Sequence, residues 1–213
     1  MARNDWFRRT TWSAADQDAF FERLERSRGS ARKAQYARIQ AVHLERTGKP
    51  ELVQASLALL DRILAEWPAD FELATVHWQR ARCYAALDRV GDAIGSFRDS
   101  FEAEAASTGP KTGAWKDFMW LIATHKLVEL YPDALALTSA EDLLFPVDRF
   151  LGHGAKALIS EERGHHSEAS QSAALAVAAA QEDKSGFRYH PDLGLVGPKY
   201  ASVVEQLQRL AER

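Results

Sequence analysis

The sequence predicts an all-α protein built from antiparallel helix pairs. Apolar residues recur three or four positions apart in one segment after another, which is the spacing of residues on a single helix face. Glycine and proline separate these segments and mark the turns between helices. Between the turn signals, no segment alternates apolar and polar residues as a half-buried strand does. We therefore expect about ten helices and no sheet.

An N-terminal arm and a first helix are expected over residues 1–30. The arm, residues 1–12, is basic and aromatic, and its rings are expected to anchor it on the body of the protein. These rings belong to Trp6, Phe7 and Trp12. Ser13 followed by Asp16 is typical of a helix N-cap with a carboxylate in the first turn. The first helix is expected to end before Gly29.

About four helix pairs are expected between residues 31 and 182. Gly48 is a suitable helix C-cap, Pro50 suits a first helical turn, and Pro68 cannot continue the helix before it. The expected helices cover residues 31–47, 50–66, 70–87, 89–106, 115–130, 132–140, 146–163 and 166–182. A loop and a capping helix are expected over residues 183–213.

The segment from Phe71 to Ala105 carries the clearest repeat pattern. Small or aromatic residues stand where two packed helices need them, at Ala81, Tyr84, Ala93, Phe97 and Ser100. Small residues let paired helices approach closely, and aromatic rings fill the space to neighbouring helices. This pattern resembles the tetratricopeptide repeat (TPR), a helix–turn–helix of about 34 residues. It departs from the family at His77, where a tryptophan is expected, and at Asp88, where the turn glycine is expected.

The resemblance implies an architecture for the whole chain, because weaker matches lie around Ala41, Ile122 and Ala157. The implied fold is a TPR-like α-solenoid of stacked antiparallel helix pairs, forming a single domain over residues 1–213 with an N-terminal helix and a C-terminal capping segment. Another kind of α-helical bundle is the alternative. The chain also resembles a group of bacterial repeat proteins with an NDWFR-type start and an SGFRYHPDLGLV-type segment, a group without an established activity.

Composition excludes several classes of protein. With 46% hydrophobic residues, six Trp and ten Phe, the chain can bury a core and is unlike disordered sequences. A single cysteine, Cys83, excludes an intramolecular disulfide and a cysteine-rich zinc site, and is expected to be buried. No window approaches the ~18 apolar residues of a membrane span, and no N-terminal run resembles a signal peptide. A cytoplasmic protein without a membrane partner is expected, and a homodimer is left open.

Motifs for catalysis or cofactor binding are missing from the sequence. It has no glycine-rich phosphate loop, no nucleophile elbow and no HExxH motif. The adjacent His165 and His166 point in different directions in a helix-to-helix turn, and no cysteine stands at ligand spacing from them. His153 could approach this pair but does not by itself define a metal site. We expect no enzyme activity, no cofactor and no metal.

In tetratricopeptide families the first helix of each pair lines a concave groove that binds proteins or peptides. The resemblance assigns this role to Gln35, Arg38, Val42, Arg46, Thr75, Trp78, Arg82, Lys116, Met119 and Lys126. Cations steer encounters with acidic partners, and Trp or Arg can anchor them. The expected partner is a protein or an acidic peptide. Replacing Trp78 and Arg82 together with alanine is expected to abolish its capture while helical content is kept.

The segment 184–197 is not explained by the repeat. Arg188, Tyr189, His190 and Asp192 are concentrated between two glycines, which suits a contact loop held by a rigid scaffold. The alternative, which we favour, is a structural cap in which apolar residues plug the end of the solenoid. The plugging residues would be Phe187, Tyr189, Leu193 and Leu195.

The sequence leaves three hypotheses for the function of the protein. The leading hypothesis is a non-enzymatic scaffold for protein–protein interaction. The alternative is an immunity or antitoxin protein that blocks a bacterial toxin, because residues 1–50 carry eleven Lys/Arg and six Asp/Glu (+5) while the remainder carries sixteen and twenty-four (−8). A nucleic-acid-associated protein is disfavoured. Its basic patch is Arg23, Arg26, Arg28, Arg32, Lys33 and Arg38, but Glu22 and Glu25 interrupt it and no recognition-helix motif is found.

Overall fold

The computed structural model describes residues 5–107, 111–137 and 144–213. Within these ranges the chain forms ten α-helices and no strand, which confirms the all-α prediction. None of the helices in these ranges is long and apolar enough to cross a membrane. The chain divides into two compact units, Met1–Ala114 and Trp115–Arg213, and each is described by itself. The prediction of a single domain over residues 1–213 stays a prediction.

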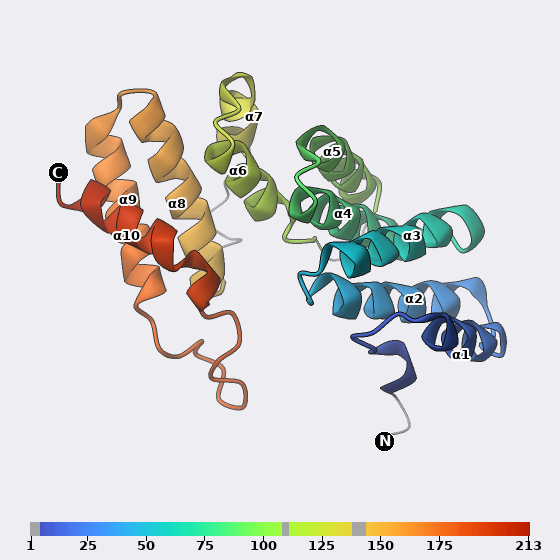
Figure 1. The fold of residues 1–213 in the computed structure, drawn as a ribbon. Helices are drawn as coiled ribbons and strands as arrows, with labels where there is room; N and C mark the ends of the chain where they lie inside the picture. Colours follow the sequence, from blue (N-terminus) through green and yellow to red (C-terminus); the bar gives the residue numbers. More distant parts are fainter. Residues whose placement is uncertain (1–4, 108–110, 138–143) are drawn as a thin grey trace. The chain divides into compact units, whose positions relative to one another are not determined.

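The first unit consists of two helix pairs preceded by a short arm and one helix. Its elements are η1 (Asp5–Phe7), α1 (Ala14–Glu25), α2 (Ser30–Glu45), α3 (Pro50–Glu66), α4 (Asp70–Ala86) and α5 (Val90–Ala106). α2 packs against α3 and α4 against α5, while α3 and α2 both contact α4 (Figure 1). These bounds lie within a few residues of the predicted ones.

The two pairs of the first unit repeat with a fixed spacing. α2 begins at Ser30 and α4 at Asp70, and α3 begins at Pro50 and α5 at Val90, so both steps are 40 residues. This period is longer than the about 34 residues of the tetratricopeptide repeat. Each pair turns through one residue in the left-handed region, Gly48 with φ 68° and Asp88 with φ 57°. An aspartate tolerates this conformation better than most residues, which explains how Asp88 replaces the expected glycine.

Small side chains bring the paired helices together, as predicted from the repeat pattern. Ala81, Ala93 and Ser100 are fully buried. The Ser100 hydroxyl donates to the Ala74 carbonyl oxygen at 2.8 Å, so this buried hydroxyl has a hydrogen-bond partner within the protein. Cys83 is also buried, as expected, and burial raises the pKa of its thiol to about 12.

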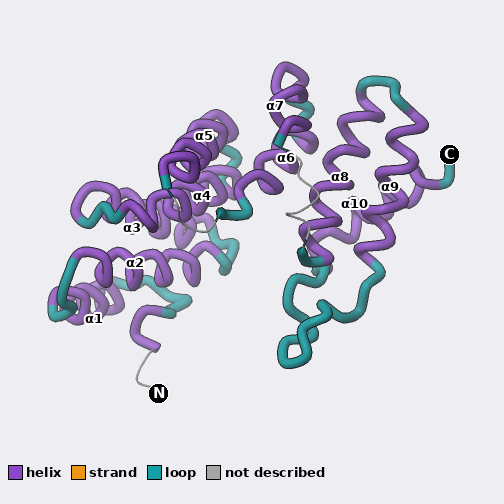
Figure 2. The backbone as a smooth tube through the Cα atoms, turned by 180° about the vertical axis from the view of Figure 1, so that it is seen from behind, coloured by secondary structure: helices purple, strands orange, loops and turns teal. Residues whose placement is uncertain are grey.

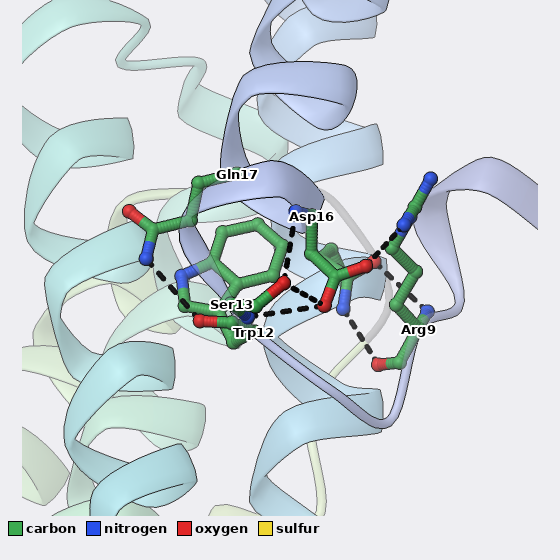
Figure 3. Close-up of polar contacts among 6 residues, drawn as sticks. Arg9, Trp12, Ser13, Asp16 and Gln17 are labelled. Carbon is green, nitrogen blue, oxygen red and sulfur yellow. Dashed lines mark hydrogen bonds and ion pairs between the residues drawn. The ribbon is translucent and has the colours of Figure 1, made fainter.

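The N-terminal arm is fastened to α1 and α2. Phe7 is buried and stacks on Tyr36 at 4.7 Å between ring centroids, which confirms that the arm is anchored by its aromatic residues. The Gln40 side chain makes two hydrogen bonds with the backbone of Arg9. Its Oε1 accepts from the Arg9 N–H at 3.0 Å, and its Nε2 donates to the Arg9 carbonyl at 2.7 Å. Figure 3 shows the Arg9 guanidinium paired with Asp16 at the start of α1.

Ser13 and Asp16 form the predicted N-cap of α1. The Ser13 N–H donates to Asp16 Oδ2 at 3.0 Å, and the Asp16 N–H donates to Ser13 Oγ at 3.2 Å (Figure 3). This reciprocal pair is a capping box. The hydrogen bond from the Ser13 backbone, and next the one from its hydroxyl, lower the pKa of Asp16 to about 2.

The capping box makes the stability of the first unit depend on pH. Replacing Asp16 with asparagine is expected to lower the free energy of unfolding by about 1 kcal/mol at neutral pH. Because the folded pKa lies below the unfolded value of about 3.9, this contribution is present above pH 4 and is lost as the pH falls towards 2. Urea unfolding of the wild type and of Asp16→Asn at several pH values checks this pH dependence. A difference that stays constant down to pH 2.5 would contradict it.

The second unit contains α6 (Ala114–Thr124, whose first residue is the unit boundary), η2 (Val128–Leu130), α7 (Tyr131–Ala136), α8 (Pro146–Glu162), α9 (His166–Ala180), η4 (Pro198–Tyr200) and α10 (Ala201–Ala211). α9 packs on α8, and α10 crosses this pair (Figure 1). Gly154 of α8 leaves room for α10, since a Cβ there would come within 3.2 Å of Leu207. Part of the predicted helix 132–140, residues 138–140, lies outside the described residues.

The predicted helix 115–130 is wrong after Thr124. There the helix closes in a Schellman motif: the Leu127 N–H donates to the Ile122 carbonyl at 3.1 Å, and Lys126 adopts a φ of 52°. The Thr124 hydroxyl donates to the Trp120 carbonyl at 2.7 Å. Glycine is the usual residue at this left-handed position, and lysine is uncommon there. The sequence therefore carries no signal that the helix ends here.

Candidate functional site

α2 and α4, the first helices of the two pairs, are joined by two ion pairs. Arg38 Nε of α2 lies 2.5 Å from Glu72 Oε2 of α4, and Arg82 Nη2 of α4 lies 2.6 Å from Glu45 Oε1 of α2. The order of these contacts along both helices shows that α2 and α4 run parallel. Both carboxylate side chains are only 8% exposed. A buried carboxylate requires such a partner, so these arginines neutralise charge inside their own unit.

The residues predicted on α2 and α4 lie on one face of each helix, since they follow one another at three- or four-residue steps. Gln35 and Arg46 are exposed, whereas Val42, Thr75 and Trp78 are partly buried. The Arg82 guanidinium lies 5.6 Å from the Trp78 ring centroid, in the range of a cation–π contact. The structure therefore places the seven residues predicted on α2 and α4 in the first unit, on adjacent helices.

Sequence reasoning missed one aromatic on this face. Phe71, in the first turn of α4, is 60% exposed. It precedes Thr75 by four positions and Trp78 by seven, so the three side chains share a helix stripe. The helical spacing from Thr75 and Trp78 could have identified Phe71. It was missed because the residues that match the family pattern begin further along the helix, at Ala81.

Two arginines lie near His43, close to the C-terminal end of α2. Burial first, and then the nearby Arg46 and Arg8, lower the pKa of His43 on α2. Arg46 and Arg8 are exposed, and neither makes an ion pair within the described part of the chain. An acidic group is therefore favoured near the C-terminal end of α2.

The predicted site residues Lys116, Met119 and Lys126 belong to the second unit. Met119 is 0% exposed and packs in the core, so its assignment to a groove is wrong. It was assigned from repeat spacing, but α6 turns this side of the helix inward. Lys116 forms an ion pair with Asp148, whose side chain is 6% exposed, and Lys126 pairs with Glu162 at 2.7 Å.

The segment 184–197 is only partly a cap. Val196 packs on the core of the second unit, and Gly194 lies against Phe145. Tyr189, however, is 79% exposed, and Phe187 and Leu193 are exposed as well. The prediction that these three side chains plug the end of the fold is wrong, because all three stay exposed, although the Phe187 ring stacks on Phe145. Leu195, the fourth residue of that prediction, is partly buried. Arg188, His190 and Asp192 are exposed too.

The buried acids Glu45, Glu72 and Asp148 were also missed. Each has an apolar or small neighbour one helical turn away on a buried stripe. Glu45 follows Ala41 by four positions, and Glu72 precedes Val76 by four; both neighbours are buried. These positions indicated burial for the acids, and a buried acid in turn indicates a cation opposite it.

Within the described ranges, no group of three metal-ligating side chains lies close enough together to hold an ion. His165 and His166 are exposed, and His166 Nδ1 lies 2.9 Å from Glu161 Oε2. No family model matches the chain, and no curated protein or solved structure matches it significantly.

Proposed function

We propose that the protein is a non-enzymatic scaffold for protein–protein interaction, with a TPR-like stacking of helix pairs that presents to its partner the face of α2 and α4 that carries Thr75 and Trp78. The observation that supports this most is the double ion pair between the two helices. Arg38–Glu72 and Arg82–Glu45 hold the helices in register, so the face needs little ordering when a partner binds.

The proposed partner is a protein segment with an apolar or aromatic anchor and an acidic group. Phe71, which is exposed, and Trp78, which is partly buried, would contact the anchor, because accessible aromatic side chains on a rigid support commonly carry binding energy. The acidic group would face Arg46 and Arg8, for which no ion pair is found among the described residues. Arg38 and Arg82 contribute less charge to the partner than the sequence predicted, since each already faces a buried glutamate.

The test replaces Phe71 and Trp78 together with alanine and leaves Arg82 in place. Arg98→Ala, on the exposed side of α5, is the control. We expect the double variant to lose a specific partner by at least about ten-fold in affinity, as for truncated aromatic anchors. Hydrogen exchange of α2 and α4 should stay unchanged. Capture that survives the double substitution would reject this face, and binding that falls steeply with salt would indicate a nucleic acid instead.

Inhibition of a bacterial toxin is the second candidate. It is favoured by the exposed turn of the second unit, which presents Tyr189 away from the helices. This function requires a tight one-to-one complex with a folded protein. Binding of short linear peptides to the α2–α4 face would count against it.

A further inference from the structure

The loop between α9 and η4 closes on itself at a narrow neck. The Ser185 N–H donates to the Pro191 carbonyl at 2.7 Å, and the Ser185 hydroxyl donates to the His190 carbonyl at 2.7 Å. Beyond the neck, the His190 N–H donates to the Phe187 carbonyl at 3.1 Å and closes a β-turn. Arg188 and Tyr189 are the two central residues of this turn. Figure 2 shows the loop in teal, projecting beyond the ends of α8 and α9.

The loop is also fixed to the start of α8. The Val147 N–H donates to the Gly194 carbonyl at 2.8 Å, and the Phe145 and Phe187 rings stack with centroids 5.4 Å apart. Gly194 has a φ of 75° and lies so close to Phe145 that a Cβ would come within 2.6 Å of that side chain. These contacts fix the turn before any partner arrives, so little conformational entropy would be lost on binding.

This loop is rich in exposed apolar side chains. Seven large hydrophobic side chains are exposed in the described ranges, and four of them belong to this loop or to the residue before Phe145. The four are Leu144, Phe187, Tyr189 and Leu193. Contiguous exposed apolar surface on a folded protein commonly marks an interaction site.

The charge of the turn favours an acidic partner. Between Lys184 and Asp192 the only residue with a permanent charge is Arg188, whose guanidinium lies 5.5 Å from the Tyr189 ring. No ion pair of Arg188 is found with the described residues. Asp183 and Asp192 offset Lys184 and Arg188, so the loop has no net positive charge to attract an anionic membrane, and a protein surface is favoured over lipid.

We propose that the turn Phe187–His190 docks into a folded protein that offers a concave apolar pocket containing a carboxylate. Tyr189 inserts its ring into the pocket, and Arg188 pairs with the carboxylate. Tyrosine and arginine are enriched among residues that dominate binding energy, and a fixed projecting turn complements a pocket rather than a flat surface. This docking goes beyond the proposed function, because it uses the second unit and none of the residues on α2 and α4.

The experiment uses the full chain with a photo-crosslinking benzoylphenylalanine at Tyr189, made in cells that naturally contain the protein. A second protein carries the probe at Leu175, which is exposed on α9. We expect one folded protein to be crosslinked from position 189 and not from position 175, at a site next to an Asp or Glu of that protein. Equal crosslinking from both positions, crosslinking to lipid, or no adduct would overturn the proposal.

The identified protein is then purified, and its affinity for the full chain is measured. Tyr189→Ala and Arg188→Glu should each weaken binding at least ten-fold, whereas Leu175→Ala should change it less than two-fold. Changing the crosslinked carboxylate to lysine should restore binding to Arg188→Glu. Affinities within two-fold of wild type for both loop variants would overturn the proposal, as would binding of the wild-type chain to phosphatidylglycerol-containing vesicles that depends on Tyr189. Phe71→Ala with Trp78→Ala should leave this binding unchanged, which separates it from the α2–α4 face.

Discussion

Replacing Arg82 with alanine is expected to lower the free energy of unfolding of the first unit by about 2 kcal/mol. The substitution leaves the Glu45 carboxylate without its cation in a site where it is 8% exposed. Removing one member of a fully buried ion pair costs about 3–5 kcal/mol. The Arg82 side chain is 37% exposed, so water screens part of the interaction and the expected loss is smaller.

Glu45, the ion-pair partner of Arg82, provides the control for this prediction. Glu45→Gln removes the buried charge together with the need to neutralise it, and should cost less than about 1 kcal/mol. The double variant Glu45→Gln with Arg82→Ala should recover most of the loss seen for Arg82→Ala alone. Hydrogen exchange of peptides from α2 and α4 gives the free energy of opening for this unit. Equal losses in Arg82→Ala and in the double variant would show that Glu45 does not depend on Arg82.

The role of Arg82 in stability makes it unsuitable as a substitution for testing partner binding. Replacing Trp78 and Arg82 together with alanine was expected to remove binding and leave the helices intact. Because Arg82 stabilises Glu45, that double substitution would also loosen the contact between α2 and α4. Loss of a partner could then come from either cause, which is why the proposed test keeps Arg82 and replaces Phe71.

Replacing Gly194 with alanine is expected to destabilise the start of α8 and release the loop of the second unit, at a cost of about 3 kcal/mol. One part of the cost comes from φ of 75°, which is unfavourable for an L-residue by about 1–2 kcal/mol. The other part comes from the added Cβ, which would lie 2.6 Å from the Phe145 side chain, and such overpacking costs about 1–3 kcal/mol.

Gly186→Ala separates the two effects. Gly186 has a similar φ of 81°, but no neighbouring atom lies within 4 Å of the position of its Cβ. Its replacement should therefore cost only about 1 kcal/mol, the part due to the backbone. Exchange of the Val147 amide hydrogen, which is bonded to the Gly194 carbonyl, measures the release. Similar exchange in both variants would show that contact with Phe145 does not hold the loop.

Helix positions were predictable because their signals are local. Pro50 begins α3 and Pro146 begins α8 as expected, and Ser13 caps α1 with Asp16. The end of α6 was not predictable, since it depends on Lys126 adopting a left-handed conformation that lysine seldom adopts. The aromatic anchoring of the arm was predicted, but its backbone recognition by Gln40, 31 residues away from Arg9, was not.

That the face formed by α2 and α4 binds a partner stays a prediction. Repeat spacing identified the face that contains Thr75, Trp78 and Arg82, because three- and four-residue steps define one side of a helix in any fold. The same spacing failed at Met119, which is buried. It also did not reveal that Arg38 and Arg82 are already neutralised by Glu72 and Glu45, which weakens the reason for expecting a strongly acidic partner.

The sequence by itself determined the all-α class, the helix pairs and most helix ends, because caps, turns and apolar periodicity act over a few residues. The tertiary structure alone decided that Arg38 and Arg82 face Glu72 and Glu45, since these pairs form only after two helices about 40 residues apart in sequence lie side by side. It also decided that Tyr189 projects into solvent, because that depends on the contact of Gly194 with Phe145, two residues far apart in the chain. Short-range signals determine where helices begin and end, whereas charge neutralisation and exposure depend on which surfaces meet.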